Sequence, residues 1–275
     1  MTILIVGGSG FLGAELVRQA ASAGHSVAAT YATGPGDASG AAWHPLDLRD
    51  TARVDSLVAA LRPRLVVNAS SGGADWSVTA QGPIRLALAA ARHGSRLVHV
   101  SSDAVFSGAR PQYDESCLPD PVTPYGAAKA AAETGVLLTH RQALVARTSL
   151  IIGGGRSAPE RLVHALATGA RDGALFTDDI RCPVHVTDLA AALLELASRR
   201  TAGIRHLAGP DALSRYELGL LIAERDGLDP ARLPTGLRAA SALPGALAVR
   251  LDGRATRRHL RTRLRGAREF CLAPR

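Results

Sequence analysis

The chain has 275 residues, of which 47% are hydrophobic and 20% are charged, and its formal net charge is +8. This composition is ordinary for a globular protein, and the length allows one large domain or two small ones. No apolar run is long enough for a membrane span and the N-terminus lacks signal-peptide features, so we expect no membrane partner. The three cysteines are far apart and form no Cys-x-x-Cys pair, which argues against a disulfide framework or a zinc site and predicts a cytoplasmic location.

Strand and helix patterns alternate from the first residue. Strands are predicted at 2–6, 25–31, 64–70, 96–102 and 143–150, and helices at 11–23, 51–62, 78–94 and from Thr123 onward. Strands that alternate with helical segments in this way imply right-handed crossovers and a parallel sheet that is covered on both faces. We therefore predict a Rossmann-type, doubly wound α/β domain that binds a dinucleotide over residues 1–152.

The pattern loosens after Ile151. Helical segments at 161–169, 185–199 and 214–227 are separated by loops and short strands. We predict that residues 153–275 form mainly a smaller substrate-binding lobe, interleaved with the first domain because segments such as 180–200 return to it.

The excess positive charge is concentrated near the C-terminus. It comes from Arg250, Arg254, Arg257, Arg258, Arg261, Arg263, Arg265 and Arg268. These arginines form a solvated basic surface or attract an anionic substrate or cofactor. No aromatic platform or nucleic-acid-binding module accompanies them, so we expect no nucleic-acid partner.

A glycine-rich turn follows the first predicted strand directly. In "VGGSGFLG", Gly7, Gly10 and Gly13 have the spacing that lets backbone N–H groups approach a pyrophosphate and lets the next helix pack on the strand. The phosphates of a dinucleotide would lie at the positive end of that helix. The alternative is a tight turn without a ligand.

The end of the second strand bears on which dinucleotide is bound. An NAD site usually has an acidic residue there, but this chain has Thr30, Tyr31 and Thr33 and neither an acid nor an arginine. We therefore favour NADPH over NADH. Further along, Asp47 is placed to bind an adenine amino group, whereas Asp50 is the ordinary helix-capping acid.

The only lysine of the chain follows a tyrosine by four residues. In "TPYGAAKAAAET", Tyr125 and Lys129 share one face of a helix that begins at Pro124. A cation beside a phenol lowers the phenol pKa, and such a tyrosine can protonate a carbonyl oxygen. "HVSSDAVFSG" offers Ser101 and Ser102 as the hydroxyl that fixes that oxygen. The alternative is a packed tyrosine with a solvated lysine.

The motifs "GGSGFLG", "VVNAS", "SSDAVFSG" and "YGAAK" together resemble the extended short-chain dehydrogenase/reductase superfamily. Within it, the chain most resembles the dTDP-4-dehydrorhamnose reductase-like, sugar-nucleotide-binding branch. The resemblance continues through "ARTSLIIG", "DDIRCPVHVTDLA" and "HLAGPDALSRYELG", so it covers essentially the whole chain.

This resemblance implies a role for each residue that matches a motif. Tyr125 is the general acid, Lys129 lowers the Tyr125 pKa and binds the nicotinamide ribose, and Ser102 orients the substrate oxygen. Cofactor contacts are implied for Gly7, Gly10, Phe11, Leu12, Gly13, Thr30, Asp47, Leu48, Asn68, Ala69, Ser70, Tyr125 and Lys129. Substrate contacts are implied for Ser70, Ser102, Asp103, Ala104, Val105, Tyr125, Leu150 and Arg181.

Several of these positions depart from the branch. Ala104 replaces a usual tyrosine, Leu150 replaces a frequent tryptophan, and Arg181 and Cys182 stand where small or hydroxylated residues are common. The deoxysugar substrate is therefore left open. Arg181 either binds a diphosphate or forms an internal ion pair with Asp178 or Asp179.

The expected function is NAD(P)H-dependent reduction of a keto group on a nucleotide-linked deoxysugar or a similar polar ketone. The alternatives are a reductase or epimerase of a non-nucleotide small molecule, and a non-catalytic cofactor-binding partner subunit. Ala104 follows Asp103 where related dehydratases have a glutamate, so a 4,6-dehydratase is not expected. The isolated histidines, with His185 expected in a buried or half-buried strand, predict no metal site. A homodimer remains open.

Overall fold

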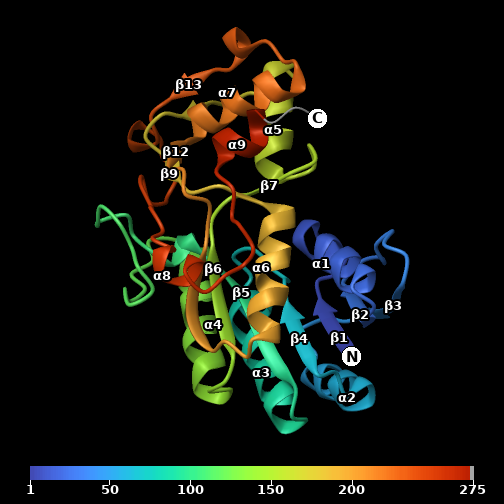
Figure 1. Cartoon of the computed structure of the whole chain (residues 1–275). Helices are drawn as coiled ribbons and strands as arrows, with labels where there is room; N and C mark the ends of the chain where they lie inside the picture. The colour runs from blue at the N-terminus through green and yellow to red at the C-terminus, as the bar shows by residue number, and fades with distance from the viewer. Residues whose placement is uncertain (273–275) are drawn as a thin grey trace.

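The computed structural model describes residues 1–272 as a three-layer α/β/α unit with a smaller lobe above it (Figure 1). Seven parallel strands form the central sheet in the order β11-β6-β5-β4-β1-β2-β3. Their bounds are β1 Thr2–Val6, β2 Ser26–Tyr31, β3 Ala41–Pro45, β4 Leu65–Asn68, β5 Arg96–Ser102, β6 Leu144–Thr148 and β11 Gly203–Leu207. The strand order reverses beside β1, where β2 lies on one side and β4 on the other, and this is where doubly wound sheets bind ligands.

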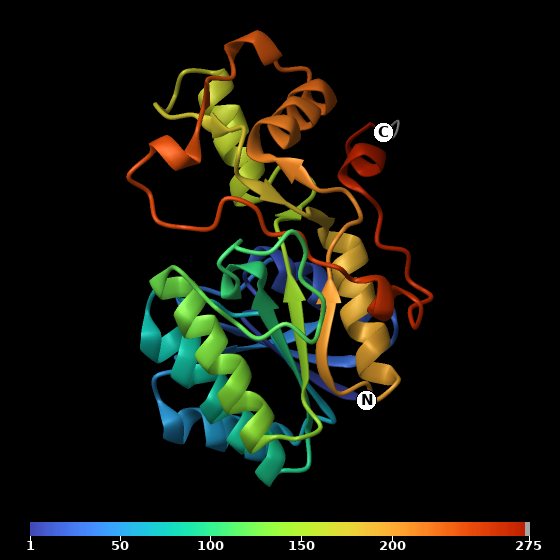
Figure 2. The same cartoon turned by 90° about the vertical axis from the view of Figure 1, so that its left-hand side faces the viewer.

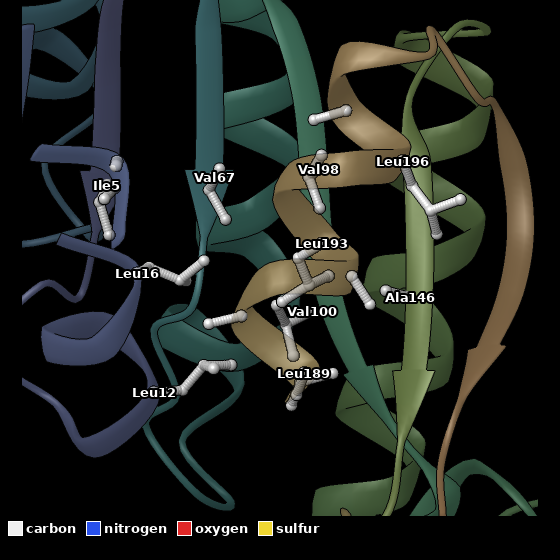
Figure 3. Packing of buried hydrophobic residues seen from close by; sticks show 14 of the residues in the cluster. Ile5, Leu12, Leu16, Val67, Val98, Val100, Ala146, Leu189, Leu193 and Leu196 are labelled. Atoms are coloured by element: carbon white, nitrogen blue, oxygen red, sulfur yellow. The ribbon is translucent and has the colours of Figure 1, made fainter. Parts of the chain in front are cut away.

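Helices cover both faces of the sheet (Figure 2). One face carries α1 (Phe11–Ser22) and α6 (Val186–Ser198), and the other carries α2 (Thr51–Leu61), α3 (Gly82–Arg92) and α4 (Pro124–Thr139). A π-helical turn, Ser77–Gln81, leads into α3. Figure 3 shows Leu189 and Leu193 of α6 beside Val98 and Val100 of β5, and Leu196 toward β6. The expected doubly wound α/β fold is confirmed, and β11 and α6 join it from the second half of the chain.

The smaller lobe lies beyond the carboxyl ends of the strands, which point toward it in Figure 2. Its helices are α5 (Ala158–Ala167), α7 (Arg215–Asp226) and α9 (Ala267–Leu272), and they share one hydrophobic cluster. The short helix α8 is Arg254–Arg257, and single 3-10 turns lie at Asp103–Val105, Pro230–Arg232 and Arg238–Ala240. The short strands, in three pairs, are β7 Ile151–Ile152 with β10 Val184–His185, β9 Ile180–Arg181 with β12 Leu213–Ser214, and β8 Leu175–Phe176 with β13 Thr235–Gly236. Within residues 1–272, none of the helices combines the length and apolar character needed to cross a membrane.

Candidate active site

The glycine turn between β1 and α1 has the geometry of a phosphate cradle. Gly7 has φ +78°, and its N–H donates to Thr30 Oγ1 over 3.1 Å. A Cβ on Gly13 would lie 2.0 Å from the Gly7 carbonyl oxygen, so only glycine lets α1 pack this closely. Within residues 1–272, no side chain caps α1 and its first turn has no acidic residue. The N–H groups of Phe11 and Leu12 at this helix end are thus suited to an anionic ligand.

The carboxyl end of β4 packs against the same turn. Asn68 Oδ1 accepts from the Ser70 N–H over 3.1 Å and from the Ser70 hydroxyl over 2.6 Å. A Cβ on Gly7 would lie 2.8 Å from Ser70 Cα, so this backbone closes one side of the cradle. Asn68 Nδ2 lies 3.2 Å from His99 Nδ1, which must therefore accept, and the ring proton is on Nε2. Burial and the charge of Lys129 hold the pKa of His99 well below its usual value, so the imidazole stays neutral.

Two acids after β3 have separate roles. Asp50 caps α2 by accepting from the Arg53 N–H over 2.9 Å, as expected. Asp47 is exposed and binds Arg49, through the backbone N–H at 2.9 Å and through Nη1 at 3.1 Å. The side chain of Leu48 is buried in the core, so a cofactor contact from Leu48 can come only from its backbone.

The first turn of α4 brings Tyr125 to the end of β5. Thr123 Oγ1 accepts from the Gly126 N–H over 3.0 Å, and Pro124 is the first helical residue. A Cβ on Gly126 would lie 2.1 Å from the Ala104 carbonyl oxygen. The missing side chain at Gly126 therefore lets the helix touch the turn that follows Ser102.

The Tyr125 side chain is half-buried beside two serine hydroxyls. Burial raises the pKa of Tyr125; hydrogen bonds with Ser102 and Ser71 oppose that rise, and the charge of Asp103 adds to it. The prediction that a neighbouring cation lowers the Tyr125 pKa is wrong for the protein alone. The reason is that Lys129 Nζ donates to the Val100 carbonyl over 3.0 Å instead of approaching the phenol.

Lys129 itself is buried, so the alternative of a solvated lysine is also wrong. Burial lowers the pKa of Lys129 to about 8, and the charge of Glu133 opposes this shift. Glu133 also pairs with Arg147 Nη2 at 2.8 Å and accepts from the Ser101 hydroxyl at 2.5 Å. Ser101 thus belongs to a buried network under the sheet edge, and Ser102 is the serine beside Tyr125.

A cavity of about 720 Å³ separates the sheet edge from the smaller lobe. Of the residues expected to contact substrate, it is lined by Ser102, Asp103, Ala104, Tyr125, Leu150 and Arg181. Val105 is instead fully buried in a hydrophobic cluster that also contains Cys182. Ser70 lies against the glycine turn and is not among the residues that line this cavity, so its contact with substrate stays a prediction.

One wall of the cavity is strongly basic. Among the described residues that line the cavity, the single carboxylate is Asp103, whereas the arginines are Arg156, Arg161, Arg181, Arg215 and Arg238. Arg181 forms an ion pair with Asp179 at 2.8 Å, so of the two alternatives for Arg181 the structure contains the internal ion pair. Asp178 instead accepts from the backbone N–H groups of Arg238 and Ala239.

Asp179 is shared among three guanidinium groups. Besides Arg181, it lies 3.3 Å from Arg215 Nε and 3.2 Å from Arg238 Nη1. Asp103 lies 3.7 Å from Arg181 Nε as a second carboxylate. Two carboxylates still do not neutralise three guanidinium groups, so this wall favours an anionic ligand. Behind it lies a second cavity of about 230 Å³, which shares Pro159, Arg215 and Arg238 with the first and is otherwise lined mainly by apolar side chains such as Phe176.

Sequence reasoning missed several residues of this site. Ser71 follows the predicted Ser70 by one position, and Ser149 donates to Asp103 Oδ2 over 2.6 Å. The missed arginines are Arg156, Arg161, Arg215 and Arg238. They lie on separate segments of the smaller lobe, and no motif or periodicity relates those segments to the glycine turn.

His164 and His185 do not line this cavity. His185 is half-buried at the end of β10, as expected, and its side chain also caps α6. His164 Nε2 lies 2.8 Å from Asp226. Within residues 1–272, no group of three or more His, Cys, Asp and Glu side chains could hold a metal ion.

Comparison with known proteins agrees with the class that the fold and this site define, the NAD(P)-dependent oxidoreductases of the extended short-chain dehydrogenase/reductase type. The family model described as the RmlD substrate binding domain matches residues 1–249, and the chain belongs to that family. A relative, the dTDP-4-dehydrorhamnose reductase of Mycobacterium tuberculosis, is 32% identical over 248 residues, covering 84% of this chain and 77% of the relative.

Two further proteins extend this comparison. The solved dTDP-4-dehydrorhamnose reductase from Bacillus anthracis, in complex with NADP, has a TM-score of 0.82 at 22% identity, over 98% of this chain and 95% of that chain. At that identity the similarity concerns the fold. Methionine adenosyltransferase 2 subunit beta of Bos taurus is 31% identical over 185 residues, covering 62% of this chain and 54% of that protein.

Proposed function

We propose that the protein reduces a ketone on a nucleotide-linked deoxysugar or a similar polar, anionic substrate, with NADPH as the hydride donor and Tyr125 as the general acid. The observation that carries this proposal is the pairing of Tyr125 with Ser102 on a cavity whose opposite wall is lined by arginines. A carbonyl oxygen placed between the two hydroxyls would lie where proton donors are already oriented, while the basic wall binds a remote anionic group.

The residues that would hold the dinucleotide fit it. Gly7 and Gly13 leave room for phosphates at the N-terminus of α1, and Asn68 fixes the backbone beside them. When bound, the reduced nicotinamide supplies the hydride. Ser102 then orients the carbonyl oxygen and Tyr125 donates the proton. Because burial raises the pKa of Tyr125, the phenol is protonated at neutral pH and able to donate.

NADPH is preferred over NADH because the end of β2 carries no carboxylate. Thr30 is buried there, and its hydroxyl accepts from the Gly7 N–H. An acid at that position would repel the 2′-phosphate of NADPH. The NADP complex of the similarly folded Bacillus anthracis reductase supports the same choice.

Tyr125→Phe tests the proposed mechanism. The variant should lose NADPH oxidation by at least about 100-fold with a panel of 4-keto nucleotide sugars, because it lacks the proton donor. The dissociation constant of NADPH, measured by fluorescence, should stay within about twofold of the wild-type value. Tyr216→Phe, in the hydrophobic cluster of the smaller lobe, is the matched control and should keep its turnover. Unchanged turnover in Tyr125→Phe would contradict the assigned role.

A non-catalytic partner subunit is the second candidate, because methionine adenosyltransferase 2 subunit beta is among the relatives. It predicts NADPH binding without turnover of any ketone in the panel. Turnover that depends on both Ser102 and Tyr125 would exclude it. A homodimer remains a prediction, to be tested by light scattering.

A further inference from the structure

The loop between β7 and α5 is built to present one arginine. Gly153, Gly154 and Gly155 all have positive φ, at +149°, +65° and +71°. The buried carboxylate of Glu160 accepts from the backbone N–H groups of Gly153, Gly155 and Ser157 over 3.0 to 3.2 Å. A Cβ on Gly154 or Gly155 would meet nothing within 4 Å, so these glycines serve the backbone path and not close packing. The loop is thus held by one side chain and leads directly to Arg156.

Arg156 differs from the other arginines of the large cavity. Arg181, Arg215 and Arg238 all pair with Asp179, and the Arg161 guanidinium donates to the Arg156 carbonyl oxygen. Within residues 1–272, the exposed guanidinium of Arg156 has neither a hydrogen bond nor an ion pair. Its charge is therefore available to a ligand at little desolvation cost.

Arg156 also lines two cavities. One is the large cavity, which contains Tyr125 and also Phe11 from the first turn of α1. The other, of about 740 Å³, lies between α1 and the loop 35–39, and begins at Ser9 beside the glycine turn. Among the described residues, Arg156 is the one that both cavities share, so it lies where they adjoin.

We propose that Arg156 binds the diphosphate of the dinucleotide from the side of the smaller lobe, opposite the glycine turn. This inference rests on the proposed cofactor. A ligand that runs from the loop after β2 to Tyr125 must pass Ser9 and Phe11, and these residues flank Arg156 in the two cavities. The groove near the loop also contains the carboxylate of Asp37, which disfavours the 2′-phosphate as the partner of Arg156.

Binding measurements on Arg156→Gln, without substrate, test this proposal. The dissociation constants of NADPH and NADH should both rise about tenfold, because the two dinucleotides share the diphosphate. The dissociation constant of reduced nicotinamide mononucleotide, which lacks the diphosphate, should change by less than about twofold. Arg156→Lys should recover part of the affinity, because it keeps the charge but loses the bidentate donors.

Arg171→Gln is the matched control, since Arg171 is exposed in the same lobe and lines neither cavity. Its affinity for both dinucleotides should equal that of the wild type. Unchanged affinities in Arg156→Gln would overturn the proposal. A loss of affinity for NADPH alone would also overturn it. So would weaker inhibition by a nucleoside diphosphate with unchanged affinity for both dinucleotides. A wild-type protein that binds neither dinucleotide would instead refute the proposed cofactor.

Discussion

Replacing Lys129 with methionine should stabilise the protein while it abolishes reduction. The Lys129 pKa is lowered from 10.5 to about 8 by burial, which corresponds to about 3 kcal/mol of unfavourable free energy for the ammonium at neutral pH. Methionine is unbranched and fits the same channel, but it leaves the Val100 carbonyl without its donor, at about 1 kcal/mol. We expect the free energy of unfolding of Lys129→Met to exceed that of the wild type by about 2 kcal/mol at pH 7.

The pH dependence of this difference has a defined sign. Below pH 8, Lys129 carries its proton in both the folded and the unfolded state, so the full penalty is present. Between pH 8 and 10.5 the folded state loses that proton first, so wild-type stability rises relative to the variant. The gap between the two proteins should therefore shrink across this window, because all other titrating groups are common to both.

Urea denaturation followed by circular dichroism at pH 7 and near pH 10 measures both effects. Thr134→Met, at an exposed position of the same helix, is the control and should show no pH-dependent gap. A Lys129→Met variant that is less stable than the wild type at pH 7, or a gap that does not change with pH, would refute the assigned burial penalty.

Two further substitutions test the packing around the site. Gly126→Ala places a Cβ 2.1 Å from the Ala104 carbonyl oxygen and should reduce kcat/KM at least about tenfold, whereas Gly94→Ala, with φ +69° and open space, should lose only about 1 kcal/mol of stability. Arg147→Met removes the guanidinium partner of the buried Glu133 and should lower the free energy of unfolding by about 3 kcal/mol. Much of this loss should be recovered when Glu133→Leu is added. Steady-state kinetics test Gly126→Ala, and a variant with wild-type kcat/KM would contradict the close packing. Urea denaturation tests the other variants, and a double variant no more stable than Arg147→Met would contradict the buried ion pair.

The regular part of the fold was predictable because each element carries its own periodicity. The alternation of strands and helices up to Thr148 predicted the parallel sheet and its two helical layers. The segment predicted as one helix at 78–94 is a π-helical turn, Ser77–Gln81, that continues directly into α3. Gly82 is needed because a Cβ there would lie 2.8 Å from Leu48 Cβ, a tertiary contact that a local pattern does not contain.

The candidate site was predictable where its residues follow strands or begin helices. Gly7, Asn68 and Ser102 are such positions, since parallel strands bring their carboxyl ends to one edge. The basic wall was not predictable, because Arg215 and Arg238 reach the cavity only through the packing of the smaller lobe around Asp179. The direction of the Tyr125 pKa was missed for a similar reason. The spacing to Lys129 gives a shared helix face but not the carbonyl that the ammonium binds.

The Val100 carbonyl, which Lys129 binds, also bears on the direction of the reaction. An ammonium in contact with the phenol would favour phenolate, the state that accepts a proton during alcohol oxidation. Here Lys129 binds the Val100 carbonyl, while burial and the nearby carboxylate of Asp103 both favour the neutral phenol. Under the proposed mechanism, Tyr125 therefore begins with the proton that ketone reduction consumes. The contact of Lys129 with the Val100 carbonyl differs from the expected contact with the phenol. It suits a reductase because the phenol keeps its proton.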